Sequence, residues 1–347
     1  MSADPASLRG RAVMVTGGCG FIGTHLVARL LALGAARVVV VDHLRHGRER
    51  PPWIENPAVR LVRHGIGFDP PGDLAPELAG IDVLAHLAAE KHNQALDQPD
   101  DLLLSNVVGT RRLFDDAADA GVGAIVFSSS LYACGRMADG AMHEDEVARP
   151  ATVYGASKLC GEHLLAHTVA RTGVEGVSLR YFFAYGPGQG LAGGYRSVIP
   201  VNFERIAGGA PPRIHGDGRQ ALDYVYVDDI VEATVRAMGG RGLPSPINVA
   251  SGKATSIIDL TDAMLAAARS PLRPEHGPPD WTAGTERYGA TERAEAALGW
   301  SAETPLEEGL RRVWRADYHG QGAGQGADIG GRDEGVGRGA EREEDRP

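Results

Sequence analysis

The stretch VMVTGGCGFIGTHLVARLLALG, residues 13–34, decides the fold class of this chain. It begins as an apolar strand, passes through a glycine-rich turn and continues as an amphipathic helix. Gly17, Gly20 and Gly23 lie three residues apart, and the small residues let a pyrophosphate approach the backbone and the helix N-terminus. A second apolar stretch, ARVVVVD, ends in Asp42, about twenty residues further on, where a carboxylate can accept hydrogen bonds from an adenosine ribose. Strand, turn, helix and acid in this order predict a dinucleotide site.

Asp42 also bears on which dinucleotide is bound. A carboxylate repels a phosphate at the 2′ position of the ribose, so the sequence favours NAD over NADP. Arg45 and Arg48 follow closely, and their positive charge opposes that preference.

Further apolar stretches extend the pattern beyond the first helix. VRLVRHG, IDVLAHLAA and GAIVFSSS are separated by segments that can form helices, which predicts a parallel sheet with helices on both faces. After Arg180 the rhythm breaks into glycine-rich loops, followed by a strand in DYVYVDD, a helix, and PINVA. The expected fold class is α/β, a Rossmann-type doubly wound parallel sheet with a smaller, irregular C-terminal substrate-binding portion. The expected division is an NAD-binding domain over 1–180 with returning segments near 223–250, a mainly substrate-binding portion over 181–318, and a disordered tail over 319–347.

Composition excludes several classes of protein. The 347 residues carry a formal net charge of −10, which argues against binding to nucleic acid or to a membrane surface, because either needs a clustered basic face. The three cysteines lack metal-ligand spacing, so we expect no metal site, no disulfide framework and a reducing compartment, the cytoplasm by default. The N-terminal stretch MSADPASLRGR lacks an apolar core, and the sequence contains no run of about 18 apolar residues, so we expect neither export nor a membrane span.

The segment ATVYGASKLCGEH, residues 151–163, carries the candidate chemistry. Tyr154 and Lys158 are one helical turn apart, so both can reach one ligand, and a nearby ammonium lowers the pKa of a phenol. A tyrosinate could then take a proton from a sugar or alcohol hydroxyl. Ser130, at the end of GAIVFSSS, would hold that hydroxyl. The alternative is an exposed helix with a packed tyrosine, preceded by serines that only cap a loop.

Taken in order, the motifs resemble the extended short-chain dehydrogenase/reductase family, specifically its nucleotide-sugar epimerases and dehydratases. The resemblance runs from about residue 11 to 315 and rests on these stretches: TGGCGFIG, VVDHLRHG, HLAAEKH, NVVGT, YGASK, LRYFFAYGPGQ, GDGRQALDYVYVDDIVEA, INVASG and LGWSAETPLEEGL. It implies tightly bound, recycled NAD, a nucleotide-sugar or related substrate, and a homodimer formed through the helices near 99–120 and 154–172.

The resemblance also assigns site residues. The catalytic residues are expected to be Ser130, Tyr154 and Lys158. The cofactor is expected to be held by Gly17, Gly20, Phe21, Ile22, Gly23, Asp42, Leu87, Ala88, Ala89, Asn106, Ser128, Tyr154 and Lys158. The substrate is expected to lie against Glu90, His92, Tyr132, Phe183 and Arg219, although His92 could equally be structural and Tyr132 a pocket wall.

Several positions depart from the family pattern. Leu131 and Tyr132 stand where 4,6-dehydratases carry the Asp-Glu pair that eliminates water, which disfavours that reaction. Gly65 replaces an acid expected near the adenine. The substrate-binding arginine, arginine and asparagine of relatives correspond here to Leu222, Asp280 and Phe183. The missing charge could come from Arg196, Arg213, Arg219 or Arg287, each of which could also be a surface arginine.

The leading hypothesis is an NAD-dependent nucleotide-sugar epimerase, acting at C4 through a transient ketosugar. The alternative is a specialised dehydratase or reductase on an unusual substrate. A third hypothesis, a non-catalytic NAD-binding or sensing protein, does not explain why Ser130, Tyr154 and Lys158 are all present.

Overall fold

The computed structural model describes residues 4–45, 50–91, 97–135, 140–189, 197–280 and 282–319. The predicted disordered tail therefore lies outside the described residues from position 320 onward.

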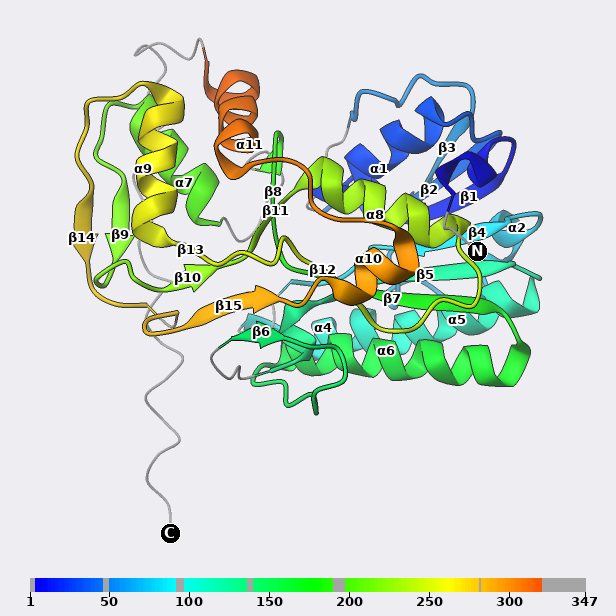
Figure 1. The fold of residues 1–347 in the computed structure, drawn as a ribbon. Coiled ribbons are helices and arrows are strands. Elements are labelled where there is room, and N and C mark those ends of the chain that lie inside the picture. The colour runs from blue at the N-terminus through cyan, green and yellow to red at the C-terminus, as the bar shows by residue number, and fades with distance from the viewer. Residues whose placement is uncertain are drawn as a thin grey trace.

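A seven-stranded sheet forms the larger part of the molecule, and all of its strand pairs are parallel (Figure 1). From one edge to the other its strands are β12 (Ile247–Val249), β7 (Glu175–Tyr181), β5 (Ala124–Ser130), β4 (Val83–His86), β1 (Ala12–Thr16), β2 (Arg37–Asp42) and β3 (Val59–Arg63). The order reverses between β1 and β4, as in a doubly wound fold. The predicted fold class and the five predicted strands that precede Arg180 are confirmed.

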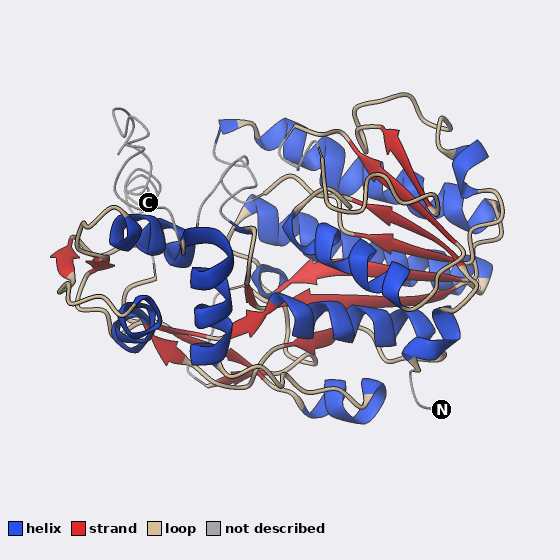
Figure 2. Cartoon of the chain, turned by 90° about the horizontal axis from the view of Figure 1, so that it is seen from above, coloured by secondary structure: helices blue, strands red, loops and turns tan. Residues whose placement is uncertain are grey.

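Helices cover both faces of this sheet (Figures 1 and 2). One face carries α1 (Phe21–Ala32) and α8 (Val227–Gly239); the other carries α2 (Ala75–Leu78), α4 (Pro99–Leu103), the π-helical segment η2 (Leu104–Gly109), α5 (Thr110–Asp119) and α6 (Val153–Thr172). Alternate residues of a strand point to opposite faces. Val13 and Val15 accordingly pack in the core cluster that includes Leu26, whereas Met14 packs with Phe114.

The C-terminal portion has a core of its own. Its helices are α7 (Val198–Ala207), α9 (Ile257–Ala268) and α11 (Leu306–Val313), which bury Phe203, Met264 and Leu310 in one cluster. A four-stranded sheet consists of β13 (Thr255–Ser256), β10 (Ala221–Leu222), β15 (Glu286–Gly289) and β6 (Ala141–Met142). Two short pairs join β11 (Tyr224–Tyr226) to β8 (Phe183–Tyr185) and β14 (Glu275–Gly277) to β9 (Arg213–His215). The remaining elements are η1 (Pro5–Leu8), η3 (Leu131–Ala133), α10 (Glu292–Leu298) and η5 (Trp314–Tyr318).

The structure differs from the sequence prediction in two strands. β7 is not among the predicted strands because Gly176 and Ser178 interrupt its apolar run. A side chain at position 176 would collide with Val169 of α6, so the close packing of α6 requires this glycine. The strand predicted in DYVYVDD is shorter than expected and pairs with β8 outside the main sheet. Its last two acids instead occupy the first turn of α8, where carboxylates favour the helix dipole.

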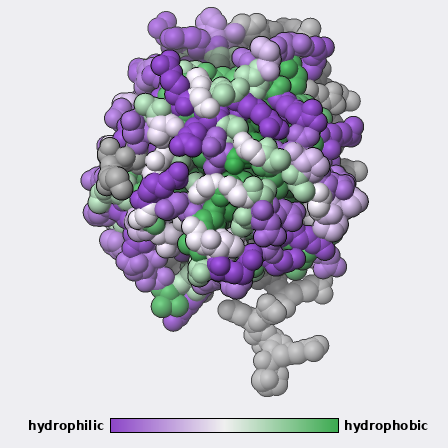
Figure 3. Space-filling model, turned by 90° about the vertical axis from the view of Figure 1, so that its right-hand side faces the viewer, coloured by the Kyte–Doolittle hydropathy of each residue, from purple (hydrophilic) through white to green (hydrophobic). Residues whose placement is uncertain are grey.

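Hydrophilic side chains spread over the end of the molecule seen in Figure 3, with hydrophobic residues in small groups among them. Within the described residues, no helix has both the length and the apolar character needed to cross a membrane.

Candidate active site

The glycine turn after β1 leaves no room for side chains. Gly17 adopts a left-handed backbone with φ of 69°, and a Cβ there would lie 2.7 Å from the amide nitrogen of Ala88. A Cβ on Gly23 would collide with the carbonyl oxygen of Gly17. Gly20 is the N-cap residue of α1 and provides no side-chain cap, so the first turn of the helix presents uncapped backbone N–H groups. This cradle fits a diphosphate.

Asp42 lies at the carboxyl end of β2, beside this turn. Its Oδ2 accepts a hydrogen bond from the Cys19 amide at 3.0 Å, and its Oδ1 accepts one from the Leu44 amide at 2.8 Å. His43 follows, with Nδ1 3.7 Å from Asp42 Oδ1 and Nε2 3.4 Å from Glu90 Oε1. Glu90, predicted on the substrate side, therefore directs its carboxylate toward the Asp42 end of the site.

The residues after β4 lie against the glycine turn. The Leu87 and Ala88 amides donate to the carbonyl and hydroxyl oxygens of Thr16 at 3.1 and 3.2 Å. Asn106 lies in η2, behind α6: its Oδ1 accepts from the Glu90 amide at 2.8 Å, and its Nδ2 donates to Ser157 Oγ at 3.1 Å. The amide of Asn106 thus ties the end of β4 to the helix that carries Tyr154.

Helix α6 has well-defined ends. The Thr152 hydroxyl accepts a hydrogen bond from the Gly155 amide at 3.0 Å, and Gly173 ends the helix in the left-handed conformation. Tyr154 therefore stands in the first turn, at the carboxyl end of the sheet, where it hydrogen-bonds to Ser130 of β5. The ring of Tyr132 packs edge-on against Tyr154, with 5.7 Å between ring centroids. Ser130, Tyr154 and Tyr132 form one cluster.

Lys158 is buried below Tyr154. Its Nζ donates to the carbonyl oxygen of Ser128 at 2.8 Å and lies 5.8 Å from the centroid of the Tyr154 ring. Burial lowers the pKa of Lys158 to about 7, while the Glu162 carboxylate opposes that shift. Burial raises the pKa of Tyr154 to about 12, and the hydrogen bond with Ser130 acts in the opposite direction. The expectation that Lys158 lowers the phenol's pKa is wrong for this structure, because desolvation outweighs it.

The other predicted substrate residues are more scattered. Phe183 is half-buried on β8, with its ring centroid 6.0 Å from that of Tyr224. Arg219 is exposed between β9 and β10, and its amide donates to Asp217. His92 and Arg196 lie outside the described residues.

Arg287 differs from the exposed Arg219 in its surroundings. It lies on β15, and its Nε is enclosed by protein. Burial lowers the pKa of this guanidinium, while Tyr132 and Asp280 oppose the shift by charge interaction. Arg287 therefore lies within electrostatic reach of the Tyr132 side of the cluster.

The departures from the family pattern have local structural roles. Leu222 is buried in the C-terminal core, and the Asp280 carboxylate accepts from the amide and hydroxyl of Thr282 at 2.8 and 2.5 Å. The Gly65 amide donates to Asp69 Oδ2 at 2.7 Å. A carboxylate is thus still present near the end of β3, four residues later in the chain.

Sequence reasoning missed three buried polar groups near the site. His86, at the end of β4, lies between the hydroxyls of Thr16 and Thr110 at 2.7 and 2.9 Å. Burial, assisted by the charge of Lys158, lowers the pKa of His86 to about 3, so this imidazole is neutral. The Asp223 carboxylate accepts four hydrogen bonds, from the amide and hydroxyl of Ser251 and the amides of Gly252 and Gly289. The third group, an ion pair between α6 and β7, is described below. All of these residues lie in quoted stretches: His86 in HLAAEKH, Asp223 in GDGRQALDYVYVDDIVEA, and the ion pair in ATVYGASKLCGEH and LRYFFAYGPGQ.

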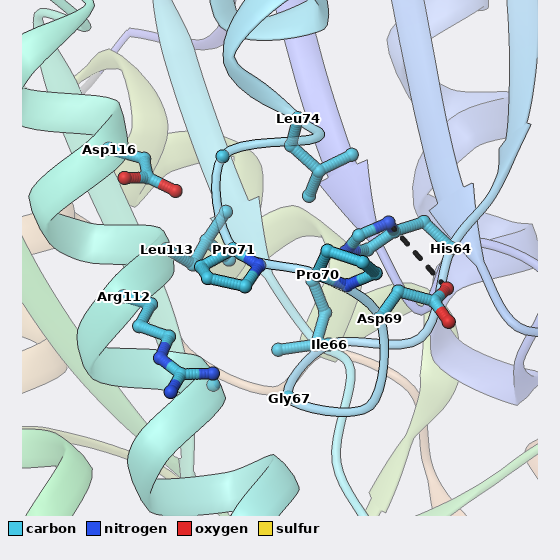
Figure 4. Close-up of a pocket in the computed structure, with 12 residues that line it drawn as sticks. His64, Ile66, Gly67, Asp69, Pro70, Pro71, Leu74, Arg112, Leu113 and Asp116 are labelled. Carbon is cyan, nitrogen blue, oxygen red and sulfur yellow. Dashed lines mark ion pairs between the residues drawn. The ribbon is translucent and has the colours of Figure 1, made fainter.

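A separate hollow lies at the end of β3 (Figure 4). Loop residues 64–74 form one wall, and Arg112, Leu113 and Asp116 of α5 form the other. His64 Nδ1 and Asp69 Oδ2, both on the loop wall, lie 3.6 Å apart (Figure 4). None of the residues predicted for catalysis lines this hollow.

Comparison with known proteins defines the class. The NAD dependent epimerase/dehydratase family matches residues 13–250. A UDP-glucose 4-epimerase of Mycolicibacterium smegmatis is 36% identical over 310 residues, covering 86% of this chain and 96% of that protein. Among solved structures, a UDP-glucose 4-epimerase from Thermotoga maritima with UDP-glucose superposes with a TM-score of 0.81 at 28% identity, covering 88% and 98% of the two chains. MoeE5 in complex with UDP-glucuronic acid and NAD gives a TM-score of 0.76 at 32% identity, covering 88% and 98%.

The chain therefore belongs to the NAD-dependent epimerase/dehydratase family, whose members include nucleotide-sugar epimerases and dehydratases. It is an NAD-dependent enzyme of that family, and the cradle at Gly17, Gly20 and Gly23 together with Asp42 fits the cofactor.

Proposed function

We propose that this protein is a nucleotide-sugar 4-epimerase that oxidises C4 of the sugar transiently and returns the hydrogen to the opposite face. The observation that carries the proposal is the cluster of Ser130, Tyr154 and Lys158 at the carboxyl end of the sheet, two strands from the glycine turn. Bound NAD, held by the glycine cradle, Asp42 and the residues after β4, would supply the reversible oxidation.

The chain's own residues then have distinct tasks. Tyr154 removes the proton from the C4 hydroxyl and later returns it, while Ser130 donates or accepts at the same oxygen and fixes its position. Lys158 as an ammonium favours the ionised phenol electrostatically. Tyr132 closes one side of the cluster with its ring and limits how the sugar can lie.

A nucleotide sugar is anionic, and we assign Arg287 as the main positive charge that meets it. A guanidinium held in a partly dehydrated site beside Tyr132 interacts more strongly with an anion than one in water. The exposed Arg219 is screened by solvent. The anion is either the diphosphate or, in an acidic sugar, its carboxylate.

Elimination of water is disfavoured by the residues that follow Ser130. A 4,6-dehydratase needs an added acid and base near C5 and C6, but Leu131 is an apolar, buried side chain and Tyr132 is a phenol. The second candidate is a specialised dehydratase or reductase. The observation that favours it is that Leu222 and Asp280 replace the substrate-binding arginines of relatives, which suggests an unusual substrate.

The test is incubation of the purified protein with UDP-glucose and, separately, UDP-glucuronic acid in D₂O. The expected result is the C4 epimer of one or both, without deuterium in the product, because C4 oxidation and return do not exchange carbon-bound hydrogen with solvent. Deuterium at C5, or loss of water, would favour the dehydratase. If neither compound reacts, the incubation is repeated with a broad panel of nucleotide sugars. Failure with all of them, despite bound NAD, would favour a non-catalytic NAD-binding protein.

We further propose a homodimer that uses the helices over 99–119 and α6. Leu103, Leu104 and Val153 on these helices are 40%, 37% and 40% exposed, so both helices offer large apolar side chains for such a contact. Light scattering of the eluted protein would give twice the mass of the 36.6 kDa chain, and a single-chain mass would refute the dimer.

A further inference from the structure

Glu162 is a buried acid that the proposed chemistry does not use. It lies on α6, four residues and one helical turn beyond Lys158, and is 9% exposed. Arg180 of β7 binds its carboxylate in bidentate fashion, with Nε at 2.9 Å from Oε1 and Nη2 at 2.8 Å from Oε2. The Ser129 hydroxyl donates to Oε1 at 2.5 Å. Three elements therefore fix this carboxylate: α6, β7 and β5.

Lys158 is also held by a contact between β5 and α6. The carbonyl oxygen of Ser128 accepts from Lys158 Nζ, and the next residue, Ser129, donates to Glu162. Successive residues of one strand thus fix successive turns of one helix. Lys158 Nζ also lies 5.0 Å from the centroid of the Phe127 ring, a further favourable contact for a cation.

The titratable groups around Lys158 differ in charge, and most of them are neutral or paired. His86 faces it from β4 and is neutral, since burial and Lys158 itself lower the pKa of that imidazole to about 3. Tyr154 is neutral at pH 7 because burial raises its pKa to about 12. Arg180 on β7 is a cation, but its guanidinium is bound to Glu162. Among the described residues that act on the charge of Lys158, Glu162 is the acid that opposes its desolvation.

We propose that Glu162 is a positioning residue that keeps Lys158 as an ammonium beneath Tyr154, and that Arg180 and Ser129 hold Glu162 in place for this purpose. The inference concerns the charge of one lysine and does not depend on the identity of the substrate. Since replacing a whole buried ion pair by apolar residues is often neutral for stability, the presence of this pair is not explained by stability alone.

The chain allows a direct test because it has three lysines, Lys91, Lys158 and Lys253. Protein labelled with ¹³C at lysine Cε gives three signals, and the Lys158→Met variant identifies the one that belongs to Lys158. Its titration is followed by NMR between pH 3 and 11 in the wild type and in Glu162→Gln. The expected result is a fall of about one to three pH units in the Lys158 midpoint, with Lys91 and Lys253 unchanged as internal controls.

Glu162→Gln leaves Arg180 buried without an anion and can impair folding. The double variant Glu162→Gln/Arg180→Met removes both charges together, a change that buried pairs often tolerate. In this variant the midpoint of Lys158 should also fall, because Glu162 is the charge that acts on it. A Lys158 midpoint within a few tenths of a pH unit of the wild type, in whichever of these variants folds, would overturn the proposal.

Discussion

Replacement of Tyr154 by phenylalanine tests the central chemical proposal with little disturbance of the fold. The ring stays packed edge-on against Tyr132, and one hydrogen bond to Ser130 is lost, worth about 0.5–1.5 kcal/mol of stability. NAD binding and the melting temperature should therefore change little. Removal of a general base usually costs about 10²- to 10⁴-fold in rate, or roughly 3–5 kcal/mol in the activation barrier. We expect a loss of turnover in that range.

The dependence of the wild-type rate on pH follows from the half-buried Tyr154 and the buried Lys158. The reactive form has an ionised Tyr154 and a protonated Lys158, with pKa values of about 12 and about 7. Below pH 7 Lys158 is protonated, and each pH unit raises the ionised fraction of Tyr154 tenfold. Above pH 7 each further pH unit lowers the protonated fraction of Lys158 tenfold, which cancels the gain in ionised Tyr154. The value of kcat/KM should therefore rise with unit slope to about pH 7 and then remain level.

The assay measures C4 epimerisation by coupled turnover between pH 5.5 and 9.5. Tyr181→Phe is the matched control, because it deletes another buried hydroxyl, which is 2.8 Å from the Thr234 hydroxyl and outside the cluster. That variant should retain near wild-type rates. A turnover rate of Tyr154→Phe within tenfold of the wild type would refute the reasoning. So would a wild-type kcat/KM that continues to rise up to about pH 10.

Three other changes have expected outcomes. Arg287→Gln should raise KM for nucleotide sugars roughly ten- to a hundredfold with kcat retained, as expected for a lost charge-assisted bond, whereas Arg219→Gln on the exposed loop should change neither. Gly23→Ala should abolish NAD binding in calorimetry, since its methyl group would collide with the glycine turn, whereas Gly208→Ala, with no contact closer than 3.4 Å, should bind normally. Asp223→Ala should cost about 3 kcal/mol and lower the melting temperature by several degrees, because the three amides and one hydroxyl bound to Asp223 lose their acceptor.

The dinucleotide fold could be predicted because its signals are local. Gly17, Gly20 and Gly23 follow a strand directly, and Asp42 ends the next strand, so the turn and the acid depend on short-range geometry. The helical spacing of Tyr154 and Lys158 is equally local. Each of these features is decided within a few residues of chain.

The electrostatics of the site could not be predicted in the same way. The direction of the Tyr154 pKa depends on how much water the fold removes, and four-residue spacing contains no information about desolvation. Glu162 and Arg180 meet across two elements and have no periodic relation in the sequence. Arg287 could be separated from Arg219 only when β15 placed it within reach of Tyr132.

The charge of Lys158 links the buried Glu162–Arg180 pair to the pH dependence of the rate. In the scheme above, the low-pH limb is set by Tyr154 alone, whereas the pH at which the plateau begins is set by Lys158. If Glu162 supports the ammonium, Glu162→Gln should leave rates on the low-pH limb unchanged, move the break to lower pH and reduce the plateau by the same factor. A merely structural role for Glu162 would instead lower the rate equally at every pH. The shape of the pH–rate profile therefore distinguishes the two roles of Glu162. Loss of the Lys158 charge lowers the rate only above the break, whereas damage to the fold lowers it at every pH.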